Sequence, residues 1–128
     1  MKVVALETSG TRGSVALLDG ARLLAEHRLP ADERSARSLL PCLKAMLDEH
    51  GWRPTDVEMV GVTTGPGSFT GIRVGVALAQ AMGFTLGIPV VAIKKTRVPN
   101  ASTTVASSVN LVLYYCSKAG KIISLKNV

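Results

Sequence analysis

The sequence predicts an α/β layer fold for residues 1–93, in which a mixed sheet packs against helices. Three strand-like runs open the chain, an amphipathic helix follows, and a strand–turn–helix–strand unit closes the patterned part. The resulting order is β-β-β-α-β-α-β. The last two strands are expected to lie parallel, because a crossover through a helix returns the chain in the same direction.

The first three strands are expected to form an antiparallel meander. Residues 2–8 (KVVALET) and 14–19 (SVALLD) are short apolar runs bounded by turn residues. Asp19-Gly20 is a strong signal for a two-residue hairpin, and it leads into a third strand over residues 22–29.

The segment ADERSARSLLPCLKAMLDEHG predicts a helix, because its apolar residues recur at helical spacing. Asp32 or Ser35 is expected to cap its start, and Gly51 to end it in a left-handed conformation. Pro41 inside the pattern predicts either a kink or a helix that starts later than Ser35. The apolar stripe consists of Leu39, Leu40, Leu43, Met46 and Leu47.

The second half of the patterned region is expected to form a parallel strand–helix–strand unit. The apolar run 57–63 predicts a strand, and residues 70–86 predict a helix that Gly87 ends. Residues 90–93 are expected to form the fifth strand.

The net charge of +6 comes from the end of the chain. Residues 1–93 contain nine basic and nine acidic side chains, whereas residues 94–128 contain six basic ones and no acid. The patterned part therefore shows no electrostatic footprint for binding RNA or DNA by itself. Residues 94–128 are also rich in Ser and Thr without a clear period, and we expect a poorly ordered tail beyond Lys94.

The composition also bounds the cellular context. No run of about 18 uninterrupted apolar residues occurs, so no transmembrane helix is expected. The chain opens with a strand-like run in place of a basic segment and an apolar signal region, so we expect a cytoplasmic protein. Cys42 and Cys116 lack metal or redox spacing, which favours idle thiols in a reducing compartment.

Small residues recur every fourth position along the second predicted helix and place minimal side chains on one ridge. Glycine inside a helix costs about 0.5–1 kcal/mol relative to alanine, so a close contact along this ridge should offset the cost. Its own sheet and a partner helix are both open as the surface in contact. The ridge consists of Gly71, Gly75, Ala79 and Gly83, flanked by Val74, Leu78 and Met82.

The stretch TTGPGSFTGIR between the fourth strand and this helix has two interpretations. Backbone N–H groups at a helix start attract anions, which favours a phosphate-binding loop. However, the spacing of Gly65, Gly67 and Gly71 is one residue longer than the dinucleotide fingerprint, and no Gly-Lys-Ser/Thr follows. The other interpretation is a structural turn in which Ser68 or Thr70 caps the helix.

Glu7 is the other candidate for chemistry, because it ends the first strand next to Thr8 and Ser9. Such a carboxylate could position a magnesium-bound water or could cap the turn. No second carboxylate is placed in sequence to pair with it. His27 and His50 share no metal-binding spacing with an acid or a cysteine, and no G-x-S-x-G nucleophile elbow occurs, so no catalytic set or metal site is predicted.

Two motifs carry a family resemblance. ALETSGTRGSVALLDG (5–20) and GPGSFTGIRVGVALAQAMGFTLGIPVVAI (65–93) closely resemble the bacterial TsaB family, and RSARSLLPCLKAMLDEHG resembles its first helix. That family commonly carries His-Ser where this chain has Arg34-Ser35. The resemblance covers about residues 1–93 and stops at Lys94. It implies the N-terminal lobe of an actin/Hsp70/sugar-kinase-like (RNase H-like) fold without the second lobe, which suggests a truncated or frameshifted chain that folds poorly alone.

The resemblance also implies a function. TsaB-like proteins are non-catalytic partners of the paralogue TsaD, and with the ATPase TsaE they support threonylcarbamoylation of the adenosine beside the anticodon of tRNAs. A TsaD-like partner, a TsaE-like protein in the wider complex, indirect contact with tRNA, no membrane and no firmly bound cofactor are therefore expected. The rival hypothesis is an ATP- or phosphate-binding protein of the superfamily, which would use Glu7, Thr8, Ser9, Gly65, Gly67 and Ser68. Relatives labelled glycoprotease-like suggest a peptidase, for which this sequence offers no nucleophile or metal ligands.

In that family, both helices of the first lobe pack against the matching helices of the partner. The same helices could also join two copies of this chain. Carried onto this sequence, the expected interface consists of Leu39, Leu40, Leu43, Leu47, Gly71, Val74, Gly75, Leu78, Ala79 and Met82, with Gly83 at its end.

Overall fold

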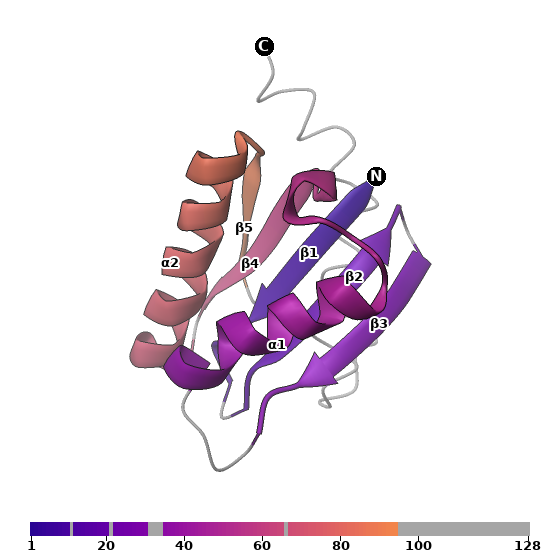
Figure 1. The fold of residues 1–128 in the computed structure, drawn as a ribbon. Helices are drawn as coiled ribbons and strands as arrows, with labels where there is room; N and C mark the ends of the chain where they lie inside the picture. Colours follow the sequence, from indigo (N-terminus) through magenta and orange to yellow (C-terminus); the bar gives the residue numbers. More distant parts are fainter. Residues whose placement is uncertain (11, 21, 31–34, 66, 95–128) are drawn as a thin grey trace.

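The computed structural model describes residues 1–10, 12–20, 22–30, 35–65 and 67–94. The predicted tail, the second cysteine and the candidate cap Asp32 lie outside these ranges. The described chain forms one five-stranded sheet in the order β3-β2-β1-β4-β5, with two helices packed on the same face (Figure 1). The predicted mixed α/β fold and its element order are confirmed.

The antiparallel meander matches the sequence closely. Strands β1 (Lys2–Glu7), β2 (Ser14–Asp19) and β3 (Arg22–Arg28) pair in succession, with Leu6 opposite Val15 at the start of the first hairpin. Gly20 follows β2 with φ 63°, the left-handed conformation that the Asp-Gly signal predicts.

Helix α1 (Ser35–Glu49) runs through Pro41, so the alternative in which the helix starts after Ser35 is wrong. Ser35 is its first residue, which does not support a cap at that position. The end is as predicted: Gly51 has φ 67°, and the Trp52 backbone N–H donates to the Leu47 carbonyl at 2.9 Å.

The parallel unit differs from the prediction at its start. A 3-10 turn (η1, Pro54–Asp56) precedes β4 (Met59–Gly65), so the strand begins two residues later than predicted and extends further. Val57 follows this turn and is buried, which explains why its apolar side chain resembles the start of a strand. Helix α2 (Phe69–Leu86) and β5 (Val90–Lys94) complete the unit, and β5 pairs parallel to β4 as predicted.

The caps of α2 settle a choice that the sequence leaves open. The Ser68 hydroxyl oxygen accepts a hydrogen bond from the Gly71 backbone N–H at 3.2 Å, so Ser68 caps the helix and Thr70 lies inside it. Gly87 ends α2 with φ 66°, and its N–H donates to the Gly83 carbonyl.

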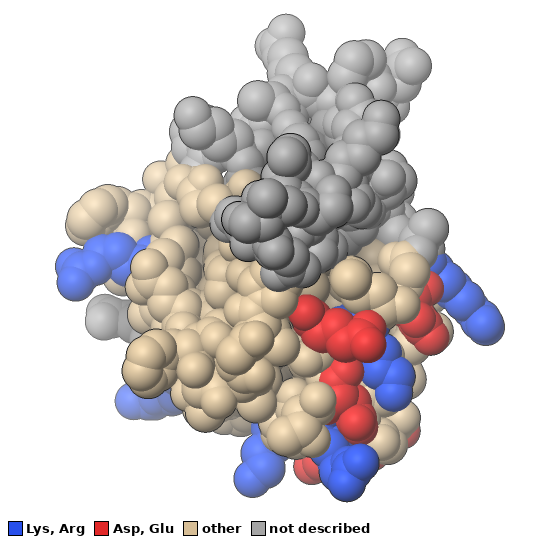
Figure 2. Space-filling model, turned by 90° about the horizontal axis from the view of Figure 1, so that it is seen from above, with Lys and Arg blue, Asp and Glu red and all other residues tan. Residues whose placement is uncertain are grey.

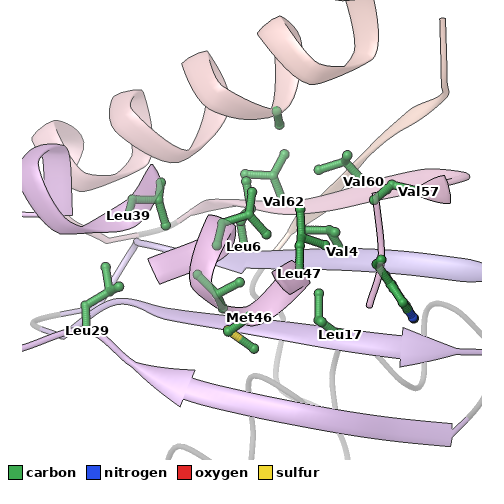
Figure 3. Close-up of a cluster of buried hydrophobic side chains, with 14 residues drawn as sticks. Val4, Leu6, Leu17, Leu29, Leu39, Met46, Leu47, Val57, Val60 and Val62 are labelled. Carbon is green, nitrogen blue, oxygen red and sulfur yellow. The ribbon is translucent and has the colours of Figure 1, made fainter. Parts of the chain in front are cut away.

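The core lies between the sheet and the two helices (Figure 3). Alternate residues of the central strands point into it, because successive strand side chains face opposite sides of the sheet. Aliphatic side chains of α1 and the only tryptophan of the chain, Trp52, pack against them. The fully buried members include Val4, Leu6, Leu17, Leu39, Met46, Val57 and Val60.

Edge strand β3 carries an acid whose environment opposes ionisation. Burial raises the pKa of Glu26 above its ordinary value, and the nearby Arg28 partly counters this rise. The side chain is half-buried, and its Oε1 atom has no hydrogen-bond partner. The folded state therefore favours protonated Glu26, so this residue's contribution to stability declines as the pH rises from the ordinary pKa of 4.5 through the raised one.

Glu26→Gln is therefore expected to stabilise the chain at pH 7 by a small amount, at most about 0.5 kcal/mol for a residue this exposed. The gain should shrink as the pH is lowered below 4, where the wild-type carboxyl is protonated in both states. Urea unfolding at both pH values measures it, with Asp48→Asn on the exposed side of α1 as control. A gain that is larger at the lower pH would contradict the explanation.

Candidate functional site

The turn before α2 is packed against the end of β1. The Ser68 backbone N–H donates to the Ser9 carbonyl at 2.8 Å. A Cβ atom at Gly67 would lie under 3.0 Å from Ser9, and one at Gly71 would lie under 3.0 Å from the Thr8 carbonyl oxygen. Both glycines are therefore required for close approach of two chain segments, which is the structural interpretation of this loop.

The ridge of small residues on α2 faces the chain's own sheet. A Cβ at Gly75 would lie under 3.0 Å from the Thr8 hydroxyl oxygen, and one at Gly83 would meet Val90. Ala79 is completely buried in the core beneath the helix. The interface prediction for Gly71, Gly75 and Ala79 is therefore corrected: these residues are small because α2 lies close to the sheet.

Glu7 forms a local turn with its neighbours. Both the backbone N–H of Ser9, at 2.7 Å, and the Ser9 hydroxyl donate to Glu7 Oε1. The Glu7 side chain is buried, and its Oε2 atom has no hydrogen-bond partner; the same holds for the hydroxyls of Thr8 and Thr63. Thr63 directly follows Val62 on β4, and Val62 is paired with Leu6, the residue before Glu7 on β1. Within the described ranges, no three His, Cys, Asp or Glu side chains are grouped to hold a metal ion.

The predicted leucine stripe of α1 divides into two roles. Leu39, Leu43 and Leu47 are at most 5% exposed and belong to the chain's own core, so each offers a partner little surface. Leu40 is 58% exposed and remains available to a partner. On α2, Val74, Leu78 and Met82 are half-buried and pack against the edge of the core.

An apolar groove of about 340 Å³ runs between the two helices. Leu40 of α1 and Met82 of α2 lie in it, together with residues that the sequence prediction missed. We call it the α1–α2 groove; its lining residues are Leu40, Leu43, Lys44, Leu47, Pro54, Ala81, Met82, Thr85 and Leu86.

The outer side of α2 is also unusually apolar. Arg73 is its only charged residue, and Phe69 and Phe84 are 72% and 93% exposed. Figure 2 shows few charged side chains on the side where α2 lies in Figure 1, whereas acidic ones gather on the other half. The absence of a polar face along α2 was visible in the sequence and could have indicated that this helix has a second contact surface.

Helix α2 also has the length and mean hydropathy expected of a membrane-crossing segment, although polar residues such as Arg73 and Gln80 interrupt its apolar run. Its glycine ridge is packed on Thr8 after β1, on Val62 of β4 and on Val90 of β5. A helix that packs on a sheet within the core passes the same test, so the criterion by itself does not distinguish the two cases.

Solved structures identify the class of fold. The chain is similar to YeaZ from Pseudomonas aeruginosa, with 36% identity and a TM-score of 0.67, covering 73% of this chain and 43% of that one. RuvC of T. thermophilus, solved with a Holliday junction substrate, aligns with a TM-score of 0.61 over 94% of this chain and 96% of its own, at 15% identity, which shows the fold alone. The described domain thus has the actin-like, RNase H-like fold that the resemblance implied.

The sequence comparisons give the family. The model of the TsaD family, described as tRNA N6-adenosine threonylcarbamoyltransferase, matches residues 29–121. Proteins named tRNA threonylcarbamoyladenosine biosynthesis protein TsaB are 31% identical in Bacillus subtilis, 31% in Escherichia coli and 34% in Haemophilus influenzae, each over 93 residues or 73% of this chain. The chain therefore belongs to the TsaD family and, within it, to the TsaB proteins.

The chain spans 41%, 40% and 39% of the lengths of these three relatives. The family match continues to residue 121, beyond Lys94, where the resemblance read from the motifs ended. The expected division into a patterned lobe and an unrelated tail stays a prediction, because the residues that would test it lie outside the described ranges.

Proposed function

We propose that the chain serves as a non-catalytic subunit in the threonylcarbamoylation of tRNA, and that it binds a TsaD-like partner through the α1–α2 groove. The observation that carries this proposal is an apolar groove with exposed Leu40 at one side, in a relative of proteins named for threonylcarbamoyladenosine biosynthesis. Apolar grooves of this kind are typical of helix-in-groove recognition. In this proposal a TsaE-like ATPase joins the complex, tRNA is contacted indirectly, and the complex is cytoplasmic.

The accessory role agrees with how the chain uses its candidate catalytic residues. Glu7 Oε1 accepts two hydrogen bonds from Ser9, and Gly67 and Gly71 allow α2 to approach β1 closely. These groups therefore have structural roles within the lobe. The partner would supply the chemistry.

Leu40→Glu is expected to weaken binding to a TsaD-like protein from the same genome by about 30-fold or more, because it places a charge in an apolar contact worth about 2 kcal/mol. Isothermal titration calorimetry with the purified 128-residue chain measures this change. Leu23→Glu changes another exposed leucine, 39% exposed on β3 and outside the groove; it is the control and should bind like the wild type. Failure of the wild-type chain to bind would contradict the proposed function.

A second candidate function is the binding of ATP with magnesium at the carboxyl ends of β1 and β4. Three buried atoms without hydrogen-bond partners, Glu7 Oε2, Thr8 Oγ1 and Thr63 Oγ1, favour it, because such groups commonly mark a missing water or ion. Millimolar ATP with magnesium should then raise the Tm of the wild-type chain and leave Glu7→Gln unchanged. A wild-type Tm that does not move would exclude this candidate.

A further inference from the structure

The sheet has a second apolar face, opposite to the one that α1 and α2 cover (Figure 1). Successive strand side chains face opposite sides of a sheet, so Val3 and Leu18 point away from the core that their neighbours Val4 and Leu17 enter. Val3 pairs with Leu18 on β2 and with Met59 on β4, which places these three side chains in one row. We call this surface the far face; its apolar members are Val3, Ala5, Ala16, Leu18, Met59 and Val91.

The side chains of the far face are shielded from water. Leu18 is completely buried, and Val3 and Met59 are 2% exposed, although all six apolar members lie outside the cluster that packs beneath α1 and α2. Strands β1 and β2 also carry uninterrupted apolar runs, VVAL and VALL. Such runs are typical of strands covered on both faces, whereas a strand with one face in water alternates apolar and polar residues. The far face therefore has a cover that the two helices do not supply.

We propose that residues 111–116 (LVLYYC) cover the far face and thereby close the lobe on the side opposite to α1 and α2. This run is the longest uninterrupted apolar stretch after Lys94, where β5 ends. The connecting residues 95–110 can span about 50 Å when extended, at about 3.3 Å per residue. Five strands at a spacing of about 4.8 Å are only about 20 Å wide, so the run can return over any strand of the sheet.

The far face offers two features that suit this run. Its second row is formed by Gly61, Ala5 and Ala16, whose small side chains leave room for bulky residues such as leucine and tyrosine. Its third row contains Glu7, which is paired with Ser14 and buried. Glu7 Oε2 has no hydrogen-bond partner among the described residues, and a tyrosine hydroxyl can donate to it. An apolar run with two tyrosines therefore complements both rows better than a purely aliphatic one.

The cover does not depend on the proposed function, because it lies on the opposite side of the sheet from the α1–α2 groove. It changes the expectation for the isolated chain. Truncation after the first lobe would leave the far face in water and would favour poor folding. A run of the same chain on that face instead predicts a 128-residue monomer that unfolds cooperatively. For residues 111–116, the proposal also replaces the poorly ordered tail that the composition suggested.

Cys116 ends the run and provides a direct test in the full chain carrying Cys42→Ala, which removes the other thiol. Iodoacetamide should alkylate Cys116 at least about tenfold more slowly in native buffer than in urea, because the covered thiol reacts only when the run opens. Leu113→Glu should abolish this protection by placing a charge inside the run. Leu125→Glu, in the other apolar stretch of residues 121–128, is the matched control and should leave the protection unchanged.

Two neighbouring valines of β1 locate the cover. Val3→Ala should raise the alkylation rate of Cys116 about threefold or more, because it weakens the far face, while Trp52 fluorescence stays native. Val4→Ala removes the same atoms from the helix side, so it should lower the urea midpoint and leave that rate unchanged. Alkylation of native Cys116 at the unfolded rate would overturn the inference, as would equal increases for both valine variants. Protection that grows with protein concentration would assign the far face to a second copy and would also overturn it.

Discussion

Gly75→Ala is expected to lower the free energy of unfolding by about 2 kcal/mol, and Thr8→Ala is expected to restore most of that loss. The new Cβ would lie under 3.0 Å from the Thr8 hydroxyl oxygen, while the Thr8 Cβ is 3.5 Å away, an ordinary contact. Alanine is about 1 kcal/mol more favourable than glycine within a helix. The expected loss of stability is therefore what remains of the steric penalty after this gain is subtracted. Removing the hydroxyl should leave the propensity gain without the conflict.

Gly71→Ala is the matched comparison, because its Cβ would meet the carbonyl oxygen of Thr8 and not its side chain. Thr8→Ala cannot relieve that conflict, so the loss should persist in the double variant. Urea unfolding followed by Trp52 fluorescence measures all six chains, since this buried residue is the only tryptophan. Equal rescue of both glycine variants by Thr8→Ala would show that α2 does not approach β1 in the way described.

The arrangement of strands could be predicted largely because local signals agree with the tertiary structure. The Asp19-Gly20 turn and the apolar runs beside it place the meander correctly. Val57 misled the prediction because burial, and not strand pairing, accounts for its apolar side chain. An apolar residue after a turn satisfies both patterns, and only the position of the neighbouring elements distinguishes them.

The candidate site was harder to predict, because periodicity shows which residues share a helix face but not what covers that face. Leu39 and Leu40 are adjacent in one apolar stripe, yet the first is 2% exposed and the second 58%. The difference depends on where α2 lies across the sheet. The same limit applies to the α2 ridge, whose small residues predict close packing without identifying the surface in contact.

Leu43→Ala and Leu40→Ala are expected to differ in their effect on stability, because the first side chain is buried in the core and the second is exposed. Leu43 is 2% exposed within the core, so its truncation should cost about 2–5 kcal/mol. Leu40→Ala should change the free energy of unfolding by no more than about 0.5 kcal/mol, because its side chain already contacts water. Urea unfolding provides the stability measurement, and calorimetry with the TsaD-like protein provides the affinity.

Only Leu40→Ala can report on the partner without an accompanying loss of the fold. Its affinity should fall while its unfolding curve overlays that of the wild type, because the groove would lose part of one wall and the core would lose nothing. Leu43→Ala should also weaken binding, but its side chain belongs both to the core and to the lining of the groove, so that loss cannot be separated from the loss of stability. If Leu40→Ala unfolds as readily as Leu43→Ala, then the exposed side of α1 contributes to the chain's own core, and the groove between the helices is not free to accept a partner.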